Sequence, residues 1–386
     1  MLRSATTALA LTLLATLAPA SAQASSAPVP MEDFRGLPPA AKADVSPAAK
    51  QLRDELLGRR WRNPRLVTLN WTGVSSFIVT IGGHVLLFDA WEILGLHADY
   101  LPIGREELAG LEPEAILIGH GHFDHAADAG YVAGRSGAAV FASVEQCSEA
   151  KEDAAAEGNA ERFRCVITGS QTTPAFGARR RARLFRDLPK ITVLKGVHSA
   201  PGPPSEQNPF DPFLPVFEPA PYLEHLNTDP AETLRFLGYL GDPEGGTRMY
   251  HLRLGRFTLL LGDSAGPIHE RKRVRRSLGR LPGCVDVMAN AILGFDQPVT
   301  GLAAPRRYVR RARPKVFLPT HGDAWAPVIS AGQAAYRTEL SSQLARLPRP
   351  PRVDYLLDPD DYMVGRSYRV GARRWRAPVP GSSCAR

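Results

Sequence analysis

The hydrophobic residues of this chain fall into short runs that alternate with longer segments whose apolar positions recur at helical spacing. Short apolar runs bounded by Gly, Pro, Asn or Asp indicate buried strands, and apolar residues three or four positions apart indicate amphipathic helices. An alternation of strands and helices predicts a layered α/β domain. The predicted strands are residues 67–71, 76–81, 85–88, 116–118, 140–142, 191–194, 257–261, 285–288 and 316–318.

The segments between these strands supply the predicted helices. One of them carries Leu340, Leu344 and Leu347 at helical spacing, which is typical of a helix with one apolar face. By the same pattern we predict helices over residues 106–111, 143–156, 305–313 and 332–347.

The N-terminal region differs from the rest of the chain. Residues 23–62 are rich in Pro and Ala and become amphipathic around Leu52, Leu56 and Leu57, which predicts a flexible leader followed by one short helix. We find no internal repeat in the sequence, so we expect one large α/β domain over residues 63–386.

The first residues have the layout of a secretory signal peptide. Arg3 precedes an apolar stretch over residues 8–18, and the small residues 20–22 come just before Gln23. The apolar stretch is shorter than the roughly 20 residues that a membrane-spanning helix needs. We therefore predict residues 1–22 to be a signal peptide cleaved near Ala22, and the protein to be exported to the periplasm or the cell exterior. The alternative is a buried N-terminal helix.

Composition narrows the class of protein. The chain has 386 residues, 44% of them hydrophobic, with 47 Lys and Arg against 39 Asp and Glu, which excludes collagen-like, disordered and multi-span membrane proteins. Arginines cluster in residues 179–183, 271–276 and 306–313. Because the first two runs lack interleaved aromatic residues, we expect no nucleic-acid partner. We interpret the runs as solvated helix faces, or else as sites that attract anionic substrates or an anionic membrane surface.

The four cysteines become possible disulfide partners if the protein is exported, because disulfides persist in oxidising compartments. Three pairings are possible, and Cys147 with Cys165 is the local choice. Free cysteines in the core are the alternative. The remaining two are Cys284 and Cys384.

The strongest chemical signal is a histidine-rich segment directly after the apolar run 115–118. It reads His120-Gly121-His122-Phe123-Asp124-His125, with four potential metal ligands in six positions. Side chains two apart in an extended segment point the same way, so His120 and His122 can bind one cation. A following turn would bring Asp124 and His125 to a second cation. Gly121 leaves room for a tight bend.

This motif resembles the HxHxDH motif of the metallo-β-lactamase superfamily, which also follows an internal strand. The resemblance extends to residues 71–77, Trp-Thr-Gly-Val-Ser-Ser-Phe, and to the apolar strand that ends in Asp89. This opening is similar to the branch containing the ascorbate-phosphate lactonase and the N-acyl-phosphatidylethanolamine phospholipase D. The match covers about residues 66–330. It implies a four-layer αβ/βα sandwich, in which two β-sheets pack face to face between outer helices.

The resemblance also implies three further ligands, each at the end of a predicted strand. His198 fits the third ligand of the first metal, Asp263 the carboxylate shared by both metals, and His321 the last ligand of the second metal. Asp89 is either a carboxylate that orients one histidine ligand or a plain strand-end cap. The implied ligand set is His120, His122 and His198 for one metal, Asp124, His125 and His321 for the other, and Asp263 between them.

Such a set constrains the reaction. Two divalent ions lower the pKa of a bridging water, so a hydroxide nucleophile forms without an activated Ser or Cys. Zn²⁺ suits this ligand set best, with Mn²⁺ or Fe also possible. We expect hydrolysis of an ester, lactone or phosphodiester in a small-molecule or lipid-like substrate, with Asp124 and Asp263 as catalytic carboxylates. The alternatives are a three-His β-lactamase, a non-catalytic metal-binding protein and an anionic-surface-binding module.

An insertion at about residues 199–230 begins beside His198. It is dense in Pro and carries Phe210, Phe213 and Phe217. We predict an apolar lid over the site, with a rigid surface loop or an oligomer contact as the alternative.

Overall fold

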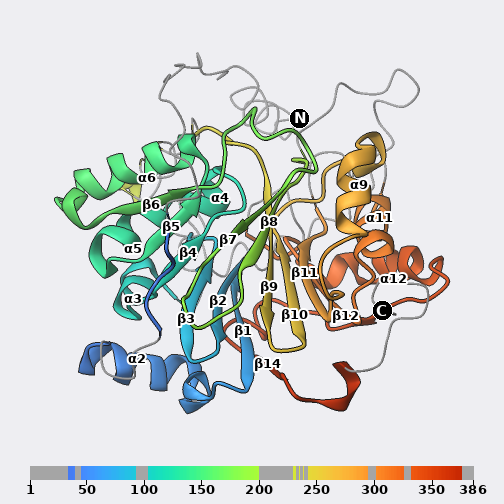
Figure 1. The fold of residues 1–386 in the computed structure, drawn as a ribbon, viewed down its shortest axis with the longest axis horizontal. Helices are drawn as coiled ribbons and strands as arrows, with labels where there is room; N and C mark the ends of the chain where they lie inside the picture. The colour runs from blue at the N-terminus through green and yellow to red at the C-terminus, as the bar shows by residue number, and fades with distance from the viewer. Residues whose placement is uncertain are drawn as a thin grey trace, which may run out of the picture.

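The structure is a computed structural model. It describes residues 34–39, 45–92, 103–199, 229–231, 234, 238, 242–293, 301–325 and 332–375. Two seven-stranded sheets face each other in the centre, with helices outside both of them (Figure 1). The predicted four-layer αβ/βα sandwich is confirmed.

The first sheet has the strand order β14-β1-β2-β3-β4-β5-β6. The pairs from β14 to β3 are antiparallel and those from β3 to β6 are parallel. Its strands are β1 (Leu66–Gly73), β2 (Ser76–Ile81), β3 (His84–Phe88), β4 (Ala115–Leu117), β5 (Ala139–Ala142), β6 (Arg164–Ile167) and β14 (Arg366–Arg369).

The second sheet has the order β13-β12-β11-β10-β9-β8-β7. The pairs from β7 to β10 are antiparallel and those from β10 to β13 are parallel, so β8, β10 and β12 run in the same direction. Its strands are β7 (Arg179–Ala182), β8 (Ile191–Lys195), β9 (Arg248–Leu254), β10 (Phe257–Gly262), β11 (Val287–Ala291), β12 (Val316–Thr320) and β13 (Arg352–Val353).

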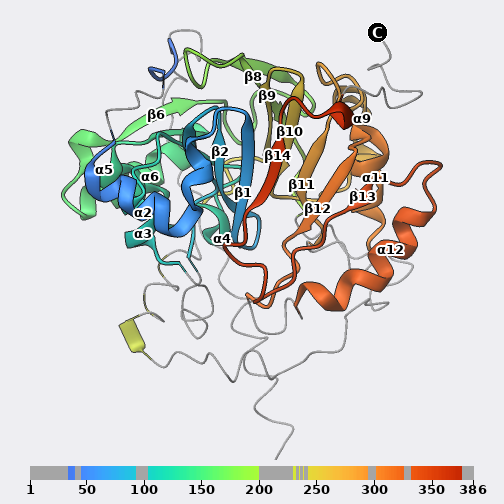
Figure 2. The same ribbon diagram turned by 90° about the horizontal axis from the view of Figure 1, so that it is seen from below.

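The helices form two separate outer layers, seen from below in Figure 2. The first sheet is covered by α2 (Pro47–Leu57), α3 (Arg105–Gly110), α5 (Ala129–Ser136) and α6 (Val144–Ala156). The second is covered by α9 (Lys272–Leu278), α11 (Ala303–Ala312) and α12 (Arg337–Ala345). The short helical turns are η2 (Arg59–Arg62), α4 (Phe123–Ala126), η4 (Ala160–Arg162), η5 (Ile268–Glu270), η6 (Gln333–Tyr336) and η7 (Arg373–Trp375).

The core follows the two-residue period of the strands. In β10, Leu259 and Leu261 pack between the two sheets, whereas Leu260 packs under the helices on the outer face. All three side chains are fully buried, and each such burial contributes about 1.5–3 kcal/mol relative to exposure. Strands that are apolar on both faces are therefore sandwiched between two layers, as the short unbroken apolar runs predicted.

All nine predicted strands and all four predicted helices are present, with ends shifted by a few residues. One interpretation of the arginine runs is wrong. Residues 179–182 form β7 at the edge of the second sheet rather than a helix face, because their backbone pairs with β8. The other two runs lie on α9 and α11, as predicted.

The folded core begins before residue 63. Leu37 packs into the core between the sheets, and the fully buried Arg53 of α2 donates hydrogen bonds to the carbonyl oxygens of Leu111 and Glu112. The helix around residues 52–57 is therefore anchored to the domain and is not part of a leader that moves independently of it.

Cys147 and Cys165 form a disulfide, as the local pairing predicted, and Cys284 is disulfide-bonded as well. The predicted signal peptide and the aromatic part of the predicted lid lie outside the described residues. In the part of the chain that is described, no helix is long and apolar enough to cross a membrane.

Candidate metal centre

The candidate ligands meet at one edge of the sandwich because each follows a strand that ends there. Asp263 comes directly after β10 and His321 directly after β12, while His198 lies three residues beyond β8. On the first sheet, the motif from His120 to His125 follows β4. Parallel strands bring their carboxyl ends to the same edge. All seven predicted ligands therefore come together, although they are separated by up to two hundred positions in the sequence.

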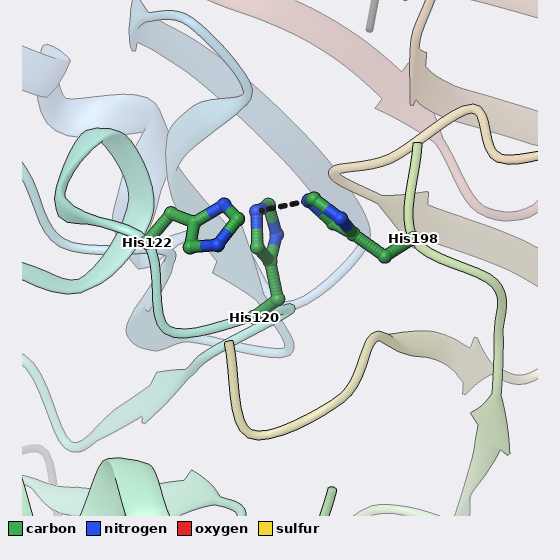
Figure 3. Close-up of side chains that lie close together, drawn as sticks. All are labelled: His120, His122 and His198. Atoms are coloured by element: carbon green, nitrogen blue, oxygen red, sulfur yellow. Dashed lines mark hydrogen bonds between the residues drawn. The ribbon is translucent and has the colours of Figure 1, made fainter. Parts of the chain in front are cut away.

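The first group consists of His120, His122 and His198, whose ring nitrogens lie within 4.8 Å of one another. Figure 3 shows the three rings converging from the segments after β4 and β8. Nε2 of His120 is 3.1 Å from Nε2 of His198. Burial lowers the pKa of all three imidazoles, and the neighbouring histidines add to the effect. These rings are therefore neutral at pH 7 and offer lone pairs to a cation.

The second group consists of Asp124, His125 and His321. Oδ2 of Asp124 is 3.2 Å from Nε2 of His125 and 3.1 Å from Nε2 of His321, and the two Nε2 atoms are 3.3 Å apart. Burial alone would raise the pKa of Asp124, but the two histidines outweigh it and hold that pKa well below its usual value. Asp124 is thus a buried, ionised carboxylate facing two imidazoles.

Asp263 lies between the two groups. Its Oδ2 is 2.6 Å from Nδ1 of His120 and 3.8 Å from Nδ1 of His125. Burial raises the pKa of Asp263 against the opposing effect of the histidines. A Cβ atom at Gly119 would lie 2.1 Å from the Asp263 carboxylate, so glycine at that position is what lets the two sheets approach this closely.

Asp89 orients His125. Its Oδ2 accepts a hydrogen bond from Nδ1 of His125 at 2.9 Å, and its Oδ1 accepts one from the backbone N–H of Gly119 at 2.9 Å. Burial, and then the charge of Asp263, raise the pKa of Asp89 to about 7. The first contact leaves Nε2 of His125 to face the cluster, which supports the orienting interpretation over a plain cap.

Several residues near the centre carry no sequence signal of their own. Glu244 places Oε2 3.9 Å from Nδ1 of His198, and its carbonyl oxygen accepts a hydrogen bond from the N–H of Gly121. A Cβ at Gly121 would lie 2.2 Å from the carbonyl oxygen of Pro243. Glycine is therefore needed here for close approach of this loop, a reason that the sequence alone did not reveal.

An aromatic wall borders the second group. The ring centroid of Trp325 is 5.5 Å from that of His321, and Trp91 and Phe123 pack on Trp325 at 5.7 and 6.0 Å. Trp91 and Trp325 are buried. The wall lowers the exposure of the second group to water and gives the centre an apolar side. Its members are scattered over the sequence and could not be grouped without the fold.

The donor set fits two divalent cations. Around a tetrahedral Zn²⁺ with ligands at about 2.0–2.1 Å, ligand atoms lie about 3.3 Å apart. The two Nε2 pairs, at 3.1 and 3.3 Å, match this separation. Among the described residues, the buried Oδ1 of Asp263 and Nδ1 atoms of His198 and His321 have no hydrogen-bond partner. Buried polar atoms normally have partners, so the cluster is incomplete as a purely protein network.

Comparison with known proteins assigns the chain to a family. Residues 69–321 match the family model of the metallo-beta-lactamase superfamily. Among relatives, a metal-dependent hydrolase of Pyrobaculum neutrophilum is 34% identical over 84 residues, which are 22% of this chain and 36% of that protein. One of Aeropyrum pernix is 34% identical over 139 residues, 36% of this chain and 54% of that protein. The aligned regions thus span about a third to a half of these two relatives.

Solved structures that match this chain have low sequence identity to it. A metallo hydrolase of the archaeon Ignicoccus hospitalis covers 78% of this chain and 98% of its own, with 17% identity and a TM-score of 0.48. The family model covers well over half of the chain and includes every candidate ligand from His120 to His321. The chain belongs to the metallo-β-lactamase superfamily.

Proposed function

We propose that this protein is an exported dinuclear metal-dependent hydrolase that cleaves an ester, lactone or phosphodiester bond in a small-molecule or lipid-like substrate. The observation that carries the proposal is the pair of facing Nε2 contacts, His120 to His198 and His125 to His321. Asp263 contacts one histidine of each pair, His120 and His125, at Nδ1. One such pair would hold each cation. The relatives named above, which are metal-dependent hydrolases, support the reaction class.

The candidate ligands would bind the two cations as two separate groups. His120, His122 and His198 would hold one cation and Asp124, His125 and His321 the other, with Asp263 shared. Zn²⁺ is the metal we expect from an imidazole-rich donor set, with Mn²⁺ or Fe next. Divalent cations in such a pair of sites supply a hydroxide nucleophile at neutral pH and polarise the bond to be cleaved.

The protein groups around this centre orient a candidate ligand and exclude water. Asp89 holds the ring of His125 through Nδ1, and the wall of Trp91, Phe123 and Trp325 keeps water from one side. A drier surrounding strengthens each electrostatic contact in the centre. Asp124 is ionised, so a carboxylate oxygen of this residue can accept a proton and return it to the leaving group.

The test compares purified wild type with His120→Ala and with His269→Ala, a matched control on an exposed turn. Each is loaded with Zn²⁺, analysed for metal content and assayed on an aryl phosphodiester, several lactones, an aryl ester and a β-lactam. We expect two metal equivalents and one dominant activity in wild type and control, and loss of that activity in His120→Ala and after chelation.

Other results would contradict the proposal. Activity on the β-lactam alone would favour the three-His β-lactamase. Two bound metals without any activity would favour a non-catalytic metal-binding protein. A single metal equivalent in active wild-type protein would exclude the dinuclear mechanism.

Export is supported by the layout of residues 1–22 and by the Cys147–Cys165 disulfide, which is typical of an oxidising compartment. After expression in a bacterium, intact-mass measurement should give a secreted chain that begins at Gln23. A chain retained in the cytoplasm with residues 1–22 attached would contradict export.

A further inference from the structure

Two arginine-rich helices lie side by side on one flank of the molecule. α9 and α11 both cover the outer face of the second sheet, on the side away from α2 and α3 (Figures 1 and 2). Five of the six residues 271–276 are Lys or Arg, and residues 303–313 contain five arginines and no acid. We call the basic residues of these two segments the cationic flank.

The buried and exposed positions show that the charges share one surface. On α9, Val274, Ser277 and Leu278 face the core, whereas Lys272, Arg273 and Arg276 are exposed. On α11, the apolar residues Tyr308, Val309 and Ala312 face the core, while Arg310 and Arg311 are exposed. The basic side chains are therefore directed outward together.

The two helices are close enough for their charges to repel each other. Partial burial lowers the pKa of Arg311, and Arg275 of α9 adds to the effect, followed by Arg310 and Arg313. The pKa of Arg306 is lowered in the same way, with Arg346 beyond α12 as the main neighbouring charge. The cationic field is thus continuous from α9 across α11 to the end of α12.

Acidic groups do little to neutralise this field. Within the described residues, no carboxylate lies within ion-pair distance of Arg273, Arg276, Arg310 or Arg311. The nearest acid along the chain is Glu270, which lies beside His269. Some arginines elsewhere do have carboxylate partners, as Arg62 with Asp54 and Arg366 with Asp361. Unneutralised like charges destabilise a folded protein, so these four exposed arginines on neighbouring helices favour an anionic partner.

An exposed aromatic ring lies at the edge of the flank. Phe176 is 40% exposed and is one of three large hydrophobic side chains that are exposed among the described residues. The guanidinium of Arg271 lies 5.0 Å from its ring centroid. The loop that carries Phe176 packs on α9, since Ser277 Oγ donates to the carbonyl oxygen of Gly177. An aromatic ring beside a basic surface is typical of protein faces that lie on a bilayer.

We propose that the cationic flank docks on the anionic surface of a phospholipid bilayer, with Phe176 entering the headgroup region. Lys and Arg side chains are attracted to anionic headgroups, and apolar side chains add to the affinity. A flat bilayer needs no groove in the protein, whereas a nucleic-acid duplex is usually read by an element inserted in a groove. Docking would hold the enzyme near lipid-like substrates without a membrane-spanning helix.

The test is vesicle co-sedimentation of the full-length mature protein at low salt. Vesicles of phosphatidylcholine with about one third phosphatidylglycerol are compared with pure phosphatidylcholine. We expect wild type to bind only the anionic vesicles and to be released at 0.5 M NaCl, because salt screens surface charges. Binding should persist in EDTA, which separates this proposal from the metal-dependent activity.

Three variants locate the surface. Each basic residue near an anionic surface contributes about fivefold to binding, so Arg276→Gln with Arg310→Gln should lower the partition coefficient by about thirtyfold. Arg60→Gln with Arg65→Gln removes two exposed charges on the opposite flank and should leave binding within about twofold. Phe176→Ser should lower binding severalfold and make the remainder more salt-sensitive. Unchanged thermal midpoints show that each variant is folded.

Several outcomes would overturn the proposal. These are no sedimentation of wild type with anionic vesicles at low salt, an equal loss in the Arg60/Arg65 control, or binding to heparin or duplex DNA without binding to vesicles. The last result would assign the flank to a soluble polyanion.

Discussion

Buried histidines lie at both ends of β3, a single one at its start and several beyond its end, and the two clusters around them differ in how their polar atoms are satisfied. At the start of β3, His84 faces carboxylates with both nitrogens: Nδ1 contacts Glu114 and Nε2 lies 2.9 Å from Asp187. Its ring stacks on Phe185. At the other end, beyond Asp89, Nε2 of His120 faces Nε2 of His198, and Nε2 of His125 faces Nε2 of His321.

The difference separates a structural cluster from a binding centre. His84 has a complementary protein partner on each side, so its cluster is complete as it stands. The histidines of the metal centre face one another, and facing nitrogens are attractive only when a proton or a cation lies between them. Both sites contain fully buried histidines, so the burial of a histidine does not by itself identify a metal site. What identifies a metal site is whether the facing atoms complement one another without a cation.

The largest effect that would sharpen this comparison is expected at the candidate metal centre. His198→Ala should remove one metal equivalent and lower the rate on the best substrate by roughly 10³-fold or more, because a metal supplies several kcal/mol of transition-state stabilisation. Metal analysis and steady-state kinetics measure both. Full metal content in this variant would show that His198 is not a ligand.

A change in the cluster around His84 should instead lower the stability of the folded protein. His84→Ala leaves the Glu114 and Asp187 carboxylates without their partner and opens space under Phe185, so we expect the free energy of unfolding to fall by about 3 kcal/mol. Urea denaturation measures it, with the exposed His269→Ala as a control that should change it by less than about 0.5 kcal/mol. Metal content should remain unchanged. Loss of metal from folded His84→Ala would show that the two ends of β3 are coupled.

A smaller effect is expected at Asp89, which joins β3 to the candidate metal centre. Asp89→Asn keeps the shape but weakens the hold on Nδ1 of His125, and changes to such supporting groups typically cost about 10–100-fold in metal affinity. Competition with a chromogenic chelator measures the affinity. An unchanged metal affinity would mean that Asp89 acts only as a cap for the Gly119 N–H.

The smallest effect concerns a third polar cluster, which is made up of carboxylates. Glu149, Asp153 and Asp242 line one small cavity beside α6. Burial, and then the charges of Glu149 and Asp153, raise the pKa of Asp242 to about 8. Because this folded-state value lies above the unfolded value, the contribution to stability is complete below about pH 4. It is lost as the pH rises through about 8.

Asp242→Asn should therefore unfold less readily than wild type at pH 9, with no such gain at pH 4. Urea midpoints at the two pH values give the comparison, and the exposed Glu161→Gln serves as the control. A gain of equal size at both pH values would show that ionisation of Asp242 is not the cause.

The sequence predicted nine of the fourteen strands in the described residues and missed β6, β7, β9, β13 and β14. It also nominated the seven candidate ligands, four from their spacing in residues 120–125 and three through the family resemblance. Residues 76–81 were predicted with the ends that β2 has, because a short apolar run between turns has few alternatives. β7 was misread because its three arginines carry no strand signal. Its strand conformation depends on pairing with β8, and a neighbouring strand is not visible in a local pattern.

The chain by itself determined which residues have the chemistry to hold metals, since imidazole and carboxylate groups in the segment 120–125 and after later strands are properties of the sequence. Only the tertiary structure decided which of these groups face one another. It placed Asp89 behind His125, Glu244 near His198 and Trp325 against His321. The physical reason is that a ligand cage depends on distances of about 3 Å between atoms carried by different strands. Those distances are set by how two sheets pack and not by spacing along the chain.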